Sequence, residues 1–289
     1  MLFQIRHTLN YSYDRPVFLE PHTLRLTPRQ DVSQRLLRHQ LEVQSPASGR
    51  CAVQEPEGSE GVVLWFNDKR EQLQIQVESQ VETRRDNPFD WIVSTAETRR
   101  LPAAYPPPFA ASLSPSLGTA PHPEVSAWAR AIAAEVEHDS AAFLMCAADR
   151  IHRDFHHVGR LDGAPLSPEQ TLRQRSGACR DTAVLFMAAC RSLGLAARFV
   201  SGYSCHHPPE VSEHELHAWA EVYLPGGGWR GYDPSLGLAV ADGHVVLAAA
   251  ADPALAAPLS GSYRGTGASS RLSYSVALQV LDRPGPELD

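Results

Sequence analysis

The spacing of apolar residues changes near residue 100, and this change constrains the fold more than any other feature of the sequence. Before that point, stretches such as "EQLQIQVESQVETR" alternate apolar and polar side chains, with Leu73, Ile75 and Val77 on one face. A period of two is the pattern of a half-buried strand. From Pro123 onward, "PEVSAWARAIAAEVE" and "SAAFLMCAADRIHRDF" carry helical spacing instead. The sequence therefore predicts an α+β protein.

We expect three consecutive parts. Residues 1–100 are predicted to form an N-terminal antiparallel β domain that resembles a β-sandwich. Residues 101–122 concentrate proline, alanine and serine, which predicts a linker or draped loop without helix or strand. Residues 123–289 are predicted to form a second domain that opens with helices and ends in closing strands.

Composition and charge exclude some classes of partner. A chain of 289 residues with 43% hydrophobic content can fill a sizeable core. A net charge of −7 with scattered Lys and Arg offers no basic field, so we expect neither nucleic acid nor a membrane surface as a partner. Five irregularly spaced cysteines indicate free thiols. The N-terminus soon becomes charged and polar, so we expect a cytoplasmic location.

Cys179 stands at the start of a helical pattern in the second domain. Apolar residues at positions 183, 184, 186, 187, 190 and 193 define a buried face that ends at Gly194. Cys179 then falls in the first turn, where free amides and the helix dipole favour a thiolate or a bound oxyanion. Cys190 lies roughly 16 Å further along the same helix, and its apolar neighbours indicate a structural role. Alone, a cysteine at such a position is more often structural than catalytic.

A candidate base and a candidate acid lie on the two strands of a predicted hairpin. His217 heads the polar face of "HAWAEVYL", and "PGGG" is predicted to turn the chain into a second strand that ends at Asp233. If Tyr223 pairs with Trp229, Asp233 lies opposite Trp219, on the face of His217 and one diagonal step away. A slip of one residue would point the carboxylate to the other face.

Two readings without a catalytic cysteine stay open. Seven of the 13 histidines lie between residues 152 and 217, and a metal site there would draw on Cys205, His206, His207 and His214. However, "HELH" lacks the i, i+4 spacing of a helical zinc pair, so we predict no metal. A non-catalytic binding module is the other alternative, and it is disfavoured because all three candidate residues are present.

Cysteine, histidine and aspartate in this chain order resemble the transglutaminase-like superfamily, whose papain-related core carries a Cys, His, Asp triad. The matching stretches are "SGACRD", "SLGLAARFVSGY", "HAWAEVYLPGGGW" and "GYDPSLG". In addition, "HTLNYSYDRPV" and "PHTLRLTPR" are similar to the β domain that precedes this core in many bacterial members. The resemblance implies a papain-like, transglutaminase-like fold for residues 123–289.

The resemblance also implies roles for the candidate residues: Cys179 as nucleophile, His217 as base and Asp233 as orienting acid. We therefore expect a cysteine-dependent hydrolase of peptide or isopeptide amides that works through a thioester and needs no cofactor. Its partner would be a peptide or protein amide substrate. Transfer of the acyl group to an amine is the alternative activity. Trp219 and Trp229 are candidates for substrate contact, although packing of the hairpin explains them better.

Overall fold

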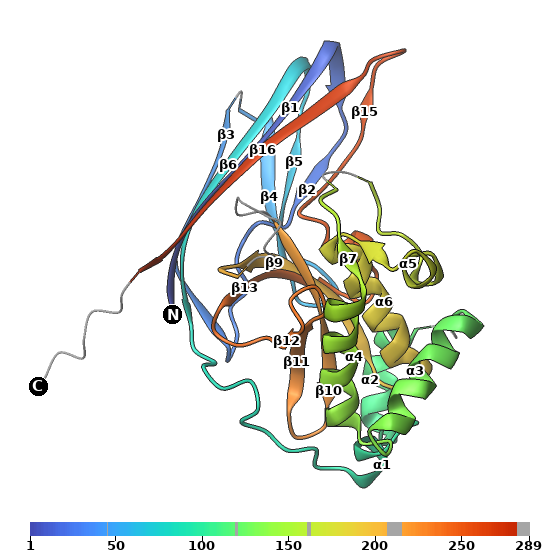
Figure 1. The fold of residues 1–289 in the computed structure, drawn as a ribbon. Helices are drawn as coiled ribbons and strands as arrows, with labels where there is room; N and C mark the ends of the chain where they lie inside the picture. Colours follow the sequence, from blue (N-terminus) through green and yellow to red (C-terminus); the bar gives the residue numbers. More distant parts are fainter. Residues whose placement is uncertain (45, 119–120, 161–162, 207–215, 282–289) are drawn as a thin grey trace, which may run out of the picture.

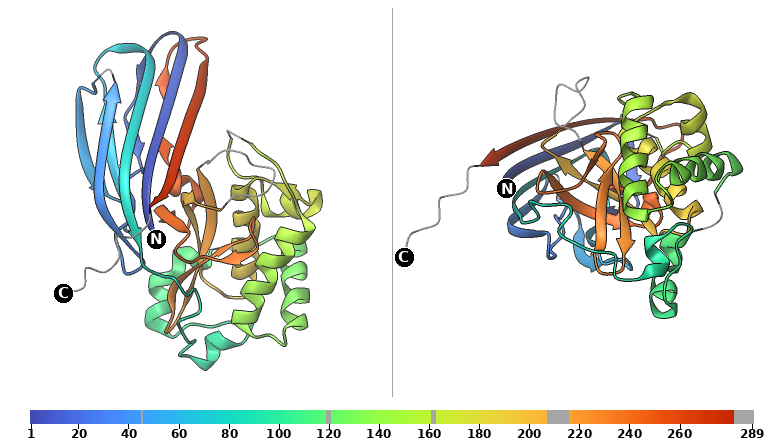
Figure 2. Two further views of the ribbon diagram at one scale, coloured as in Figure 1. Left: turned by 60° about the vertical axis from the view of Figure 1, so that its left-hand side comes forward. Right: turned by 60° about the horizontal axis from the view of Figure 1, so that its bottom comes forward.

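The computed structural model describes residues 1–44, 46–118, 121–160, 163–206 and 216–281. An elongated β domain stands against a second domain in which helices cover one face of a sheet (Figures 1 and 2). The structure thus has the expected α+β class and the expected antiparallel N-terminal sheets. Within these described residues, no helix is both long and apolar enough to cross a membrane.

The N-terminal domain consists of two antiparallel sheets. One has the strand order β15-β1-β6-β3 with β16 also paired to β1, and the other has the order β14-β2-β5-β4. Apolar side chains on alternate positions face the space between the sheets, as Leu73, Ile75 and Val77 do on β6. The strands of the first half of the chain are β1 (Leu2–Leu19), β2 (His22–Leu24), β3 (Gln34–Gln44), β4 (Gly49–Gln54), β5 (Glu60–Trp65) and β6 (Lys69–Thr83).

The last strands of the chain belong to these N-terminal sheets, which differs from the prediction that residues 123–289 form one core domain. Strand β16 (Ser270–Leu281) runs antiparallel to β1 from Leu2↔Leu281 to Tyr13↔Ser270 (Figure 1). Strands β14 (Leu259–Ser260) and β15 (Tyr263–Arg264) pair with β2 and β1. A strand with alternating apolar and polar side chains needs a free strand edge to pair with and an apolar surface to cover. The edge of β1 and the apolar cluster of the N-terminal sheets provide these for β16.

A second departure concerns the segment predicted as a linker. Residues 101–122 contain helix α2 (Pro107–Leu117), preceded by the short helix α1 (Ala96–Arg99). Proline is tolerated in the first turn of a helix because the amides there have no acceptor within the helix. Alanines and serines continue α2, and Leu113 and Ser116 are buried. A proline-rich composition therefore concealed a helix start.

The second domain is built around a five-stranded antiparallel sheet with the order β12-β11-β10-β9-β13. Its strands are β9 (Ala197–Ser204), β10 (His217–Leu224), β11 (Gly228–Asp233), β12 (Leu238–Ala239) and β13 (His244–Ala250). The remaining elements are α3 (Pro123–Glu135), α4 (Ser140–Asp154), β7 (His156–His157), α5 (Pro168–Gln174), β8 (Ser176–Gly177), α6 (Cys179–Ser192) and the 3₁₀ helix η1 (Pro253–Ala256).

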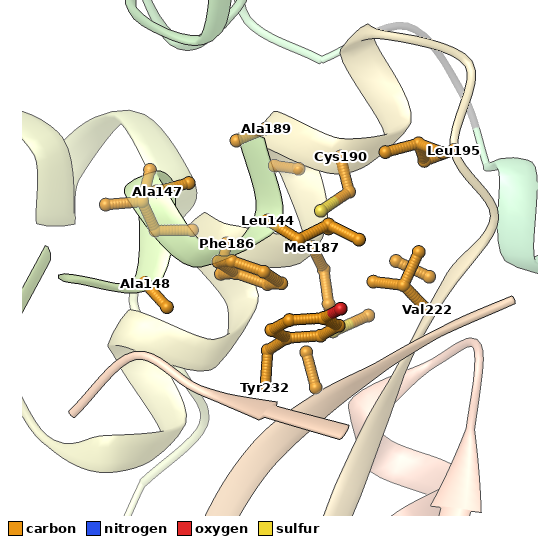
Figure 3. Packing of buried hydrophobic residues seen from close by; sticks show 14 of the residues in the cluster. Leu144, Ala147, Ala148, Phe186, Met187, Ala189, Cys190, Leu195, Val222 and Tyr232 are labelled. Atoms are coloured by element: carbon orange, nitrogen blue, oxygen red, sulfur yellow. The ribbon is translucent and has the colours of Figure 1, made fainter. Parts of the chain in front are cut away.

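Helix α6 is the central helix of this domain. It packs on β10 and against α3, and its buried face includes Phe186 and Met187 (Figure 3). Phe186 stacks on Tyr232 of β11 with ring centroids 5.8 Å apart. Cys190 is completely buried in the same cluster, and burial raises the pKa of its thiol. The structural role predicted for Cys190 is therefore confirmed.

The two domains share a tightly packed interface. Tyr203, Val245 and Leu247 of the core sheet are buried in the apolar cluster of the N-terminal domain. The Gln34 side chain donates to the Val246 carbonyl at 2.9 Å and accepts from the Val246 amide at 2.8 Å. A side chain of the N-terminal domain thus provides both hydrogen-bond partners for the Val246 backbone at the edge of the core sheet. These bonds hold the two domains together.

Two polar contacts reinforce this interface. Glu221 on β10 is buried and accepts hydrogen bonds from Arg29 of the N-terminal domain at 2.7 and 3.2 Å and from Arg198 on β9 at 2.6 and 2.8 Å. Elsewhere, His7 Nδ1 of β1 lies 3.0 Å from the Tyr203 hydroxyl, with both side chains buried. Burial lowers the pKa of His7 to about 4.

Candidate active site

Cys179 is the first residue of α6, as the sequence predicts. The small residues Gly177 and Ala178 precede it, and a side chain at Gly177 would collide with Asp181. The Asp181 carboxylate accepts from the Ala178 amide at 2.8 Å and from the Leu166 amide at 2.8 Å. Asp181 is buried. Its hydrogen bonds fix the start of α6, and its negative charge is favourable at the positive end of the helix dipole.

The hairpin of β10 and β11 has the register that was considered from the sequence, with Tyr223 opposite Trp229. The ladder continues to Ala220↔Tyr232. His217, the first residue of β10, therefore shares a face with Asp233, the last residue of β11. The two side chains meet, with His217 Nε2 2.6 Å from Asp233 Oδ2.

The Asp233 carboxylate is held by hydrogen bonds on both oxygens. Oδ1 accepts from the Ser235 amide at 3.1 Å, the Ser235 hydroxyl at 2.7 Å and the Leu236 amide at 3.2 Å. Oδ2 faces His217 and also His244 Nε2, which lies 3.0 Å away. Asp233 is fully buried, so these contacts replace the water it would otherwise bind.

His217 links this carboxylate to the cysteine. His217 is hydrogen-bonded to Asp233 and lies close enough to Cys179 for that side chain to raise its pKa. Since Nε2 faces Asp233, Nδ1 is the ring nitrogen left for the sulfur. Burial opposes the charge on the ring, but the Asp233 carboxylate and the Cys179 sulfur outweigh it and raise the pKa of His217 well above its usual value. Cys179 itself is only partly buried. The structure thus brings the three predicted residues together, with His217 bonded to Asp233 and within interaction range of Cys179.

The same charges act on the partners of His217. Burial would raise the pKa of Asp233, but the charge of His217 and the hydrogen bonds from His217 and His244 lower it strongly. For His244, burial dominates and lowers the pKa. Asp233 is therefore the anion and His244 the neutral imidazole of this group, and His217 is the ring that can take up a proton.

Trp219 packs against this group from the interior, with its ring centroid 6.1 Å from that of His217 and 5.0 Å from that of His244, whereas Trp229 lies away from it. Trp219 is completely buried against Val200, Val246 and Ala249, so it has no surface to offer a substrate. Trp229 lies at the far end of the hairpin, six residues from His217 along the ladder or roughly 20 Å. There it packs edge-on against Tyr223 and under Arg198. Packing thus explains both residues, and substrate contact by either tryptophan stays a prediction.

The histidine-rich stretches give a different cluster from the one considered in the sequence. His207 and His214 lie outside the described residues. Among the residues that the structure does describe, His217, Asp233 and His244 are the group whose possible ligand atoms lie within 4.8 Å of one another. These atoms already contact each other at 2.6 and 3.0 Å, which is closer than two ligands of one tetrahedral zinc ion, about 3.3 Å apart.

Sequence reasoning missed His244 and the tethering role of Asp181. His244 opens "HVVLAAA", a strand that is otherwise apolar. A single polar residue at the head of a buried strand is the signal that could have marked it.

Comparison with known proteins identifies two regions of the chain. Residues 126–234 match the transglutaminase-like superfamily, and residues 3–82 match the bacterial transglutaminase-like N-terminal region. An uncharacterized protein of Mycobacterium leprae is 26% identical over 272 residues, covering 92% of this chain and 94% of that protein. One of Mycobacterium bovis is 27% identical over 293 residues, covering 95% and 91%.

Among solved structures, the fold is similar to one from Cytophaga hutchinsonii that bears the name "Putative Cysteine Protease". The TM-score is 0.73 at 22% identity, over 98% of this chain and 92% of that one. This likeness extends over both domains and concerns the fold. With matches to both family regions, the chain belongs to the transglutaminase-like superfamily and carries its bacterial N-terminal region ahead of the core.

Proposed function

We propose that the protein is a cysteine-dependent amide hydrolase that acts on a peptide or isopeptide bond through a thioester. The observation that carries the proposal is the position of His217, which is hydrogen-bonded to the Asp233 carboxylate and lies close enough to Cys179 for that side chain to raise its pKa. A nucleophile, a base and a group that orients the base are the parts that such chemistry requires. Membership of the superfamily and the name of the Cytophaga hutchinsonii protein support the same reading.

The proposed reaction begins with proton transfer from Cys179 to His217. The carboxylate of Asp233 accepts a hydrogen bond from His217 Nε2–H, which keeps the lone pair on Nδ1 pointing toward the sulfur. The thiolate attacks the amide carbonyl, and the backbone amide of Cys179 at the start of α6 stabilises the resulting oxyanion, because the first amide of a helix has no acceptor within it. His217 then returns the proton to the leaving amine, which leaves an acyl thioester on Cys179.

Water completes the cycle. His217 takes a proton from a water molecule as the oxygen attacks the thioester, and the thiol of Cys179 leaves with that proton while the acid product departs. We favour water over an amine as the acceptor because neither Trp219 nor Trp229 is positioned to line a second approach to the sulfur. Acyl transfer generally needs a shielded path for the amine.

The test is covalent capture of the nucleophile. Incubation with a panel of peptide and acyl electrophiles, followed by mass spectrometry of the digested protein, should place the adduct on Cys179. Cys179→Ala should abolish the adduct, and His217→Ala should reduce its rate of formation. Cys146→Ala, at a partly buried cysteine on α4, is the matched control and should leave the rate unchanged. Adducts that form equally fast on Cys146 and Cys179 would contradict the proposal.

A further inference from the structure

A second histidine shares the oxygen that orients the first. His244 Nε2 lies 3.0 Å from Asp233 Oδ2, the same atom that His217 Nε2 approaches at 2.6 Å. The three residues come from β13, β11 and β10. The His244 side chain is 1% exposed, and its contact with Asp233 lies within the interior of the site. A buried polar side chain in this position is costly unless it is paired.

The hydrogen-bond inventory fixes the proton on His244. An ionised carboxylate can only accept, so the Nε2 atoms of both histidines must carry hydrogens that point at Oδ2. Oδ1 is already engaged by Ser235 and Leu236. Rotation of the carboxylate would therefore break hydrogen bonds on both oxygens at once. His244 donates the hydrogen bond to Oδ2 that lies beside the one from His217.

The groups around His244 keep it neutral. Those facing it are the Asp233 carboxylate, the rings of His217 and His206 with centroids 6.1 and 6.2 Å away, and the edge of the Trp219 indole at 5.0 Å. Ser204 pairs with it across the neighbouring strand. Burial and the two imidazoles disfavour a charge on His244, and only Asp233 favours one.

We propose that His244 is a positioning residue of the active site, which holds the Asp233 carboxylate through a neutral Nε2–H donor so that Asp233 in turn fixes His217 beside Cys179. This inference rests on the proposed function and adds a fourth member to its machinery. Without the donor, Oδ2 keeps a single partner, the carboxylate can turn or recruit water, and the His217 ring loses its fixed orientation toward the sulfur.

Alkylation of Cys179 tests this without knowledge of the substrate. The rate of carboxamidomethylation of Cys179 by iodoacetamide is measured by mass spectrometry from pH 4 to pH 9. His244→Phe should move the pH of half-maximal rate upward by about one unit, the equivalent of one hydrogen bond to a charged group. His244→Gln places an amide donor near the position of Nε2 and should recover more than half of this shift. His39→Phe, in the N-terminal domain, is the matched control.

The outcomes distinguish a failure of the proposed function from a failure of the positioning role of His244 alone. If His217→Ala leaves the curve unchanged, the proposed function fails. If His217→Ala shifts the curve while His244→Phe coincides with the unaltered protein, the positioning role alone is overturned. Equal shifts for His244→Phe and His244→Gln would also overturn it, because the donor would then not matter.

A measurement on the unaltered protein covers the case in which His244→Phe does not fold. The ¹⁵N shifts of labelled histidines distinguish the two neutral tautomers and the charged ring. His244 should be neutral with its proton on Nε2 at pH 7 to 8. A proton on Nδ1 alone, or a charged ring, would exclude the proposed hydrogen bond to Asp233.

Discussion

Tyr223 of β10 and Trp229 of β11 face each other directly, and this single pairing decides which side of the sheet Asp233 occupies. The turn between them contains Gly226 and Gly228 in left-handed conformations, at φ of 92° and 71°. A side chain on Gly226 would also collide with the Ile92 carbonyl. The turn therefore fixes the register that brings the carboxylate to His217.

Replacement of Asp233 by asparagine should slow turnover by a factor on the order of 10² to 10⁴. The asparagine oxygen can still accept from Ser235 and Leu236, but its NH₂ group then faces His217 Nε2. His217 must accept there and carry its proton on Nδ1, toward Cys179, where a base is needed. The comparison is kcat against Ser235→Ala, which removes one donor and should cost less. A change of less than threefold for Asp233→Asn would contradict the role given to Asp233.

Limiting iodoacetamide at pH 6 should modify Cys179 faster than any other cysteine. An isolated thiol is only about 0.3% ionised at that pH, whereas Cys179 can pass its proton to His217. Cys51 is exposed, so its rate of modification shows the effect of accessibility alone. Cys190 is buried and should stay unmodified in the folded protein. Tryptic peptides quantified over time give the rates. Modification of Cys51 ahead of Cys179 would exclude an activated thiol.

Glu221→Gln should lower the free energy of unfolding by about 3 to 5 kcal/mol, because it leaves the guanidinium group of Arg198 buried without a countercharge and that of Arg29 with Asp31 alone. Burial opposes the charge on Glu221, but the two arginines outweigh it and lower its pKa to about 2. Urea unfolding at pH 7 is the measurement. Glu78→Gln, which loses a half-exposed pair with Arg6, is the control and should cost about 0.5 kcal/mol.

Acid should weaken the contact between the domains through His7. In the unfolded chain His7 binds a proton below pH 6.5, but in the folded protein its pKa is about 4. Between these values the unfolded state holds more protons, so the free energy of unfolding falls as the pH falls, by about 3 kcal/mol in all. This part of the stability is fully present above pH 6.5.

The variant His7→Gln isolates this contribution. From pH 7 to pH 4 the unaltered protein should lose about 3 kcal/mol more than His7→Gln does, measured by urea unfolding at each pH. His156→Gln, at an exposed position, should follow the unaltered protein. Parallel curves for His7→Gln and the unaltered protein would mean that His7 does not titrate as its burial implies.

Hydrolysis should predominate over transfer when a glutamine-containing peptide and a primary amine are supplied together. Since neither tryptophan of the hairpin lines a path to Cys179, water has the easier access to the thioester. Mass spectrometry of the products gives the ratio of free acid to amine adduct. Predominance of the adduct at millimolar amine would replace the hydrolase with an acyl transferase and leave the roles of Cys179 and His217 intact.

The parts of the site that could be predicted from sequence are those fixed by local patterns. The helix start at Cys179 follows from one apolar stripe, and the relation of His217 to Asp233 follows from the parity of one hairpin. His244 has no such local link, because β13 lies beyond β9, at the opposite edge of the sheet from β11 and β12. Its approach to Asp233 depends on how the sheet curves, which no short stretch of sequence encodes.

The same limit applies to the fold. Alternation predicted the strands of the first half, but the pairing of β16 with β1 joins segments more than 250 residues apart. The composition of residues 101–122 obscured α2, because prolines that open a helix look the same in sequence as prolines that prevent one. Long-range pairing and the position of a proline within its turn are both set by packing.

The pairing of β1 with β16 also bears on how the chain is made. At roughly 5 to 20 residues per second, the ribosome delivers residues 270–281 on the order of 10 to 50 s after β1 has emerged. Throughout that interval β1 presents an open edge with unpaired amides and carbonyls, which is the form in which strands of different chains join. Protection of this edge during synthesis, by a chaperone or by rapid docking of the nascent core, is therefore part of what the fold demands of the cell.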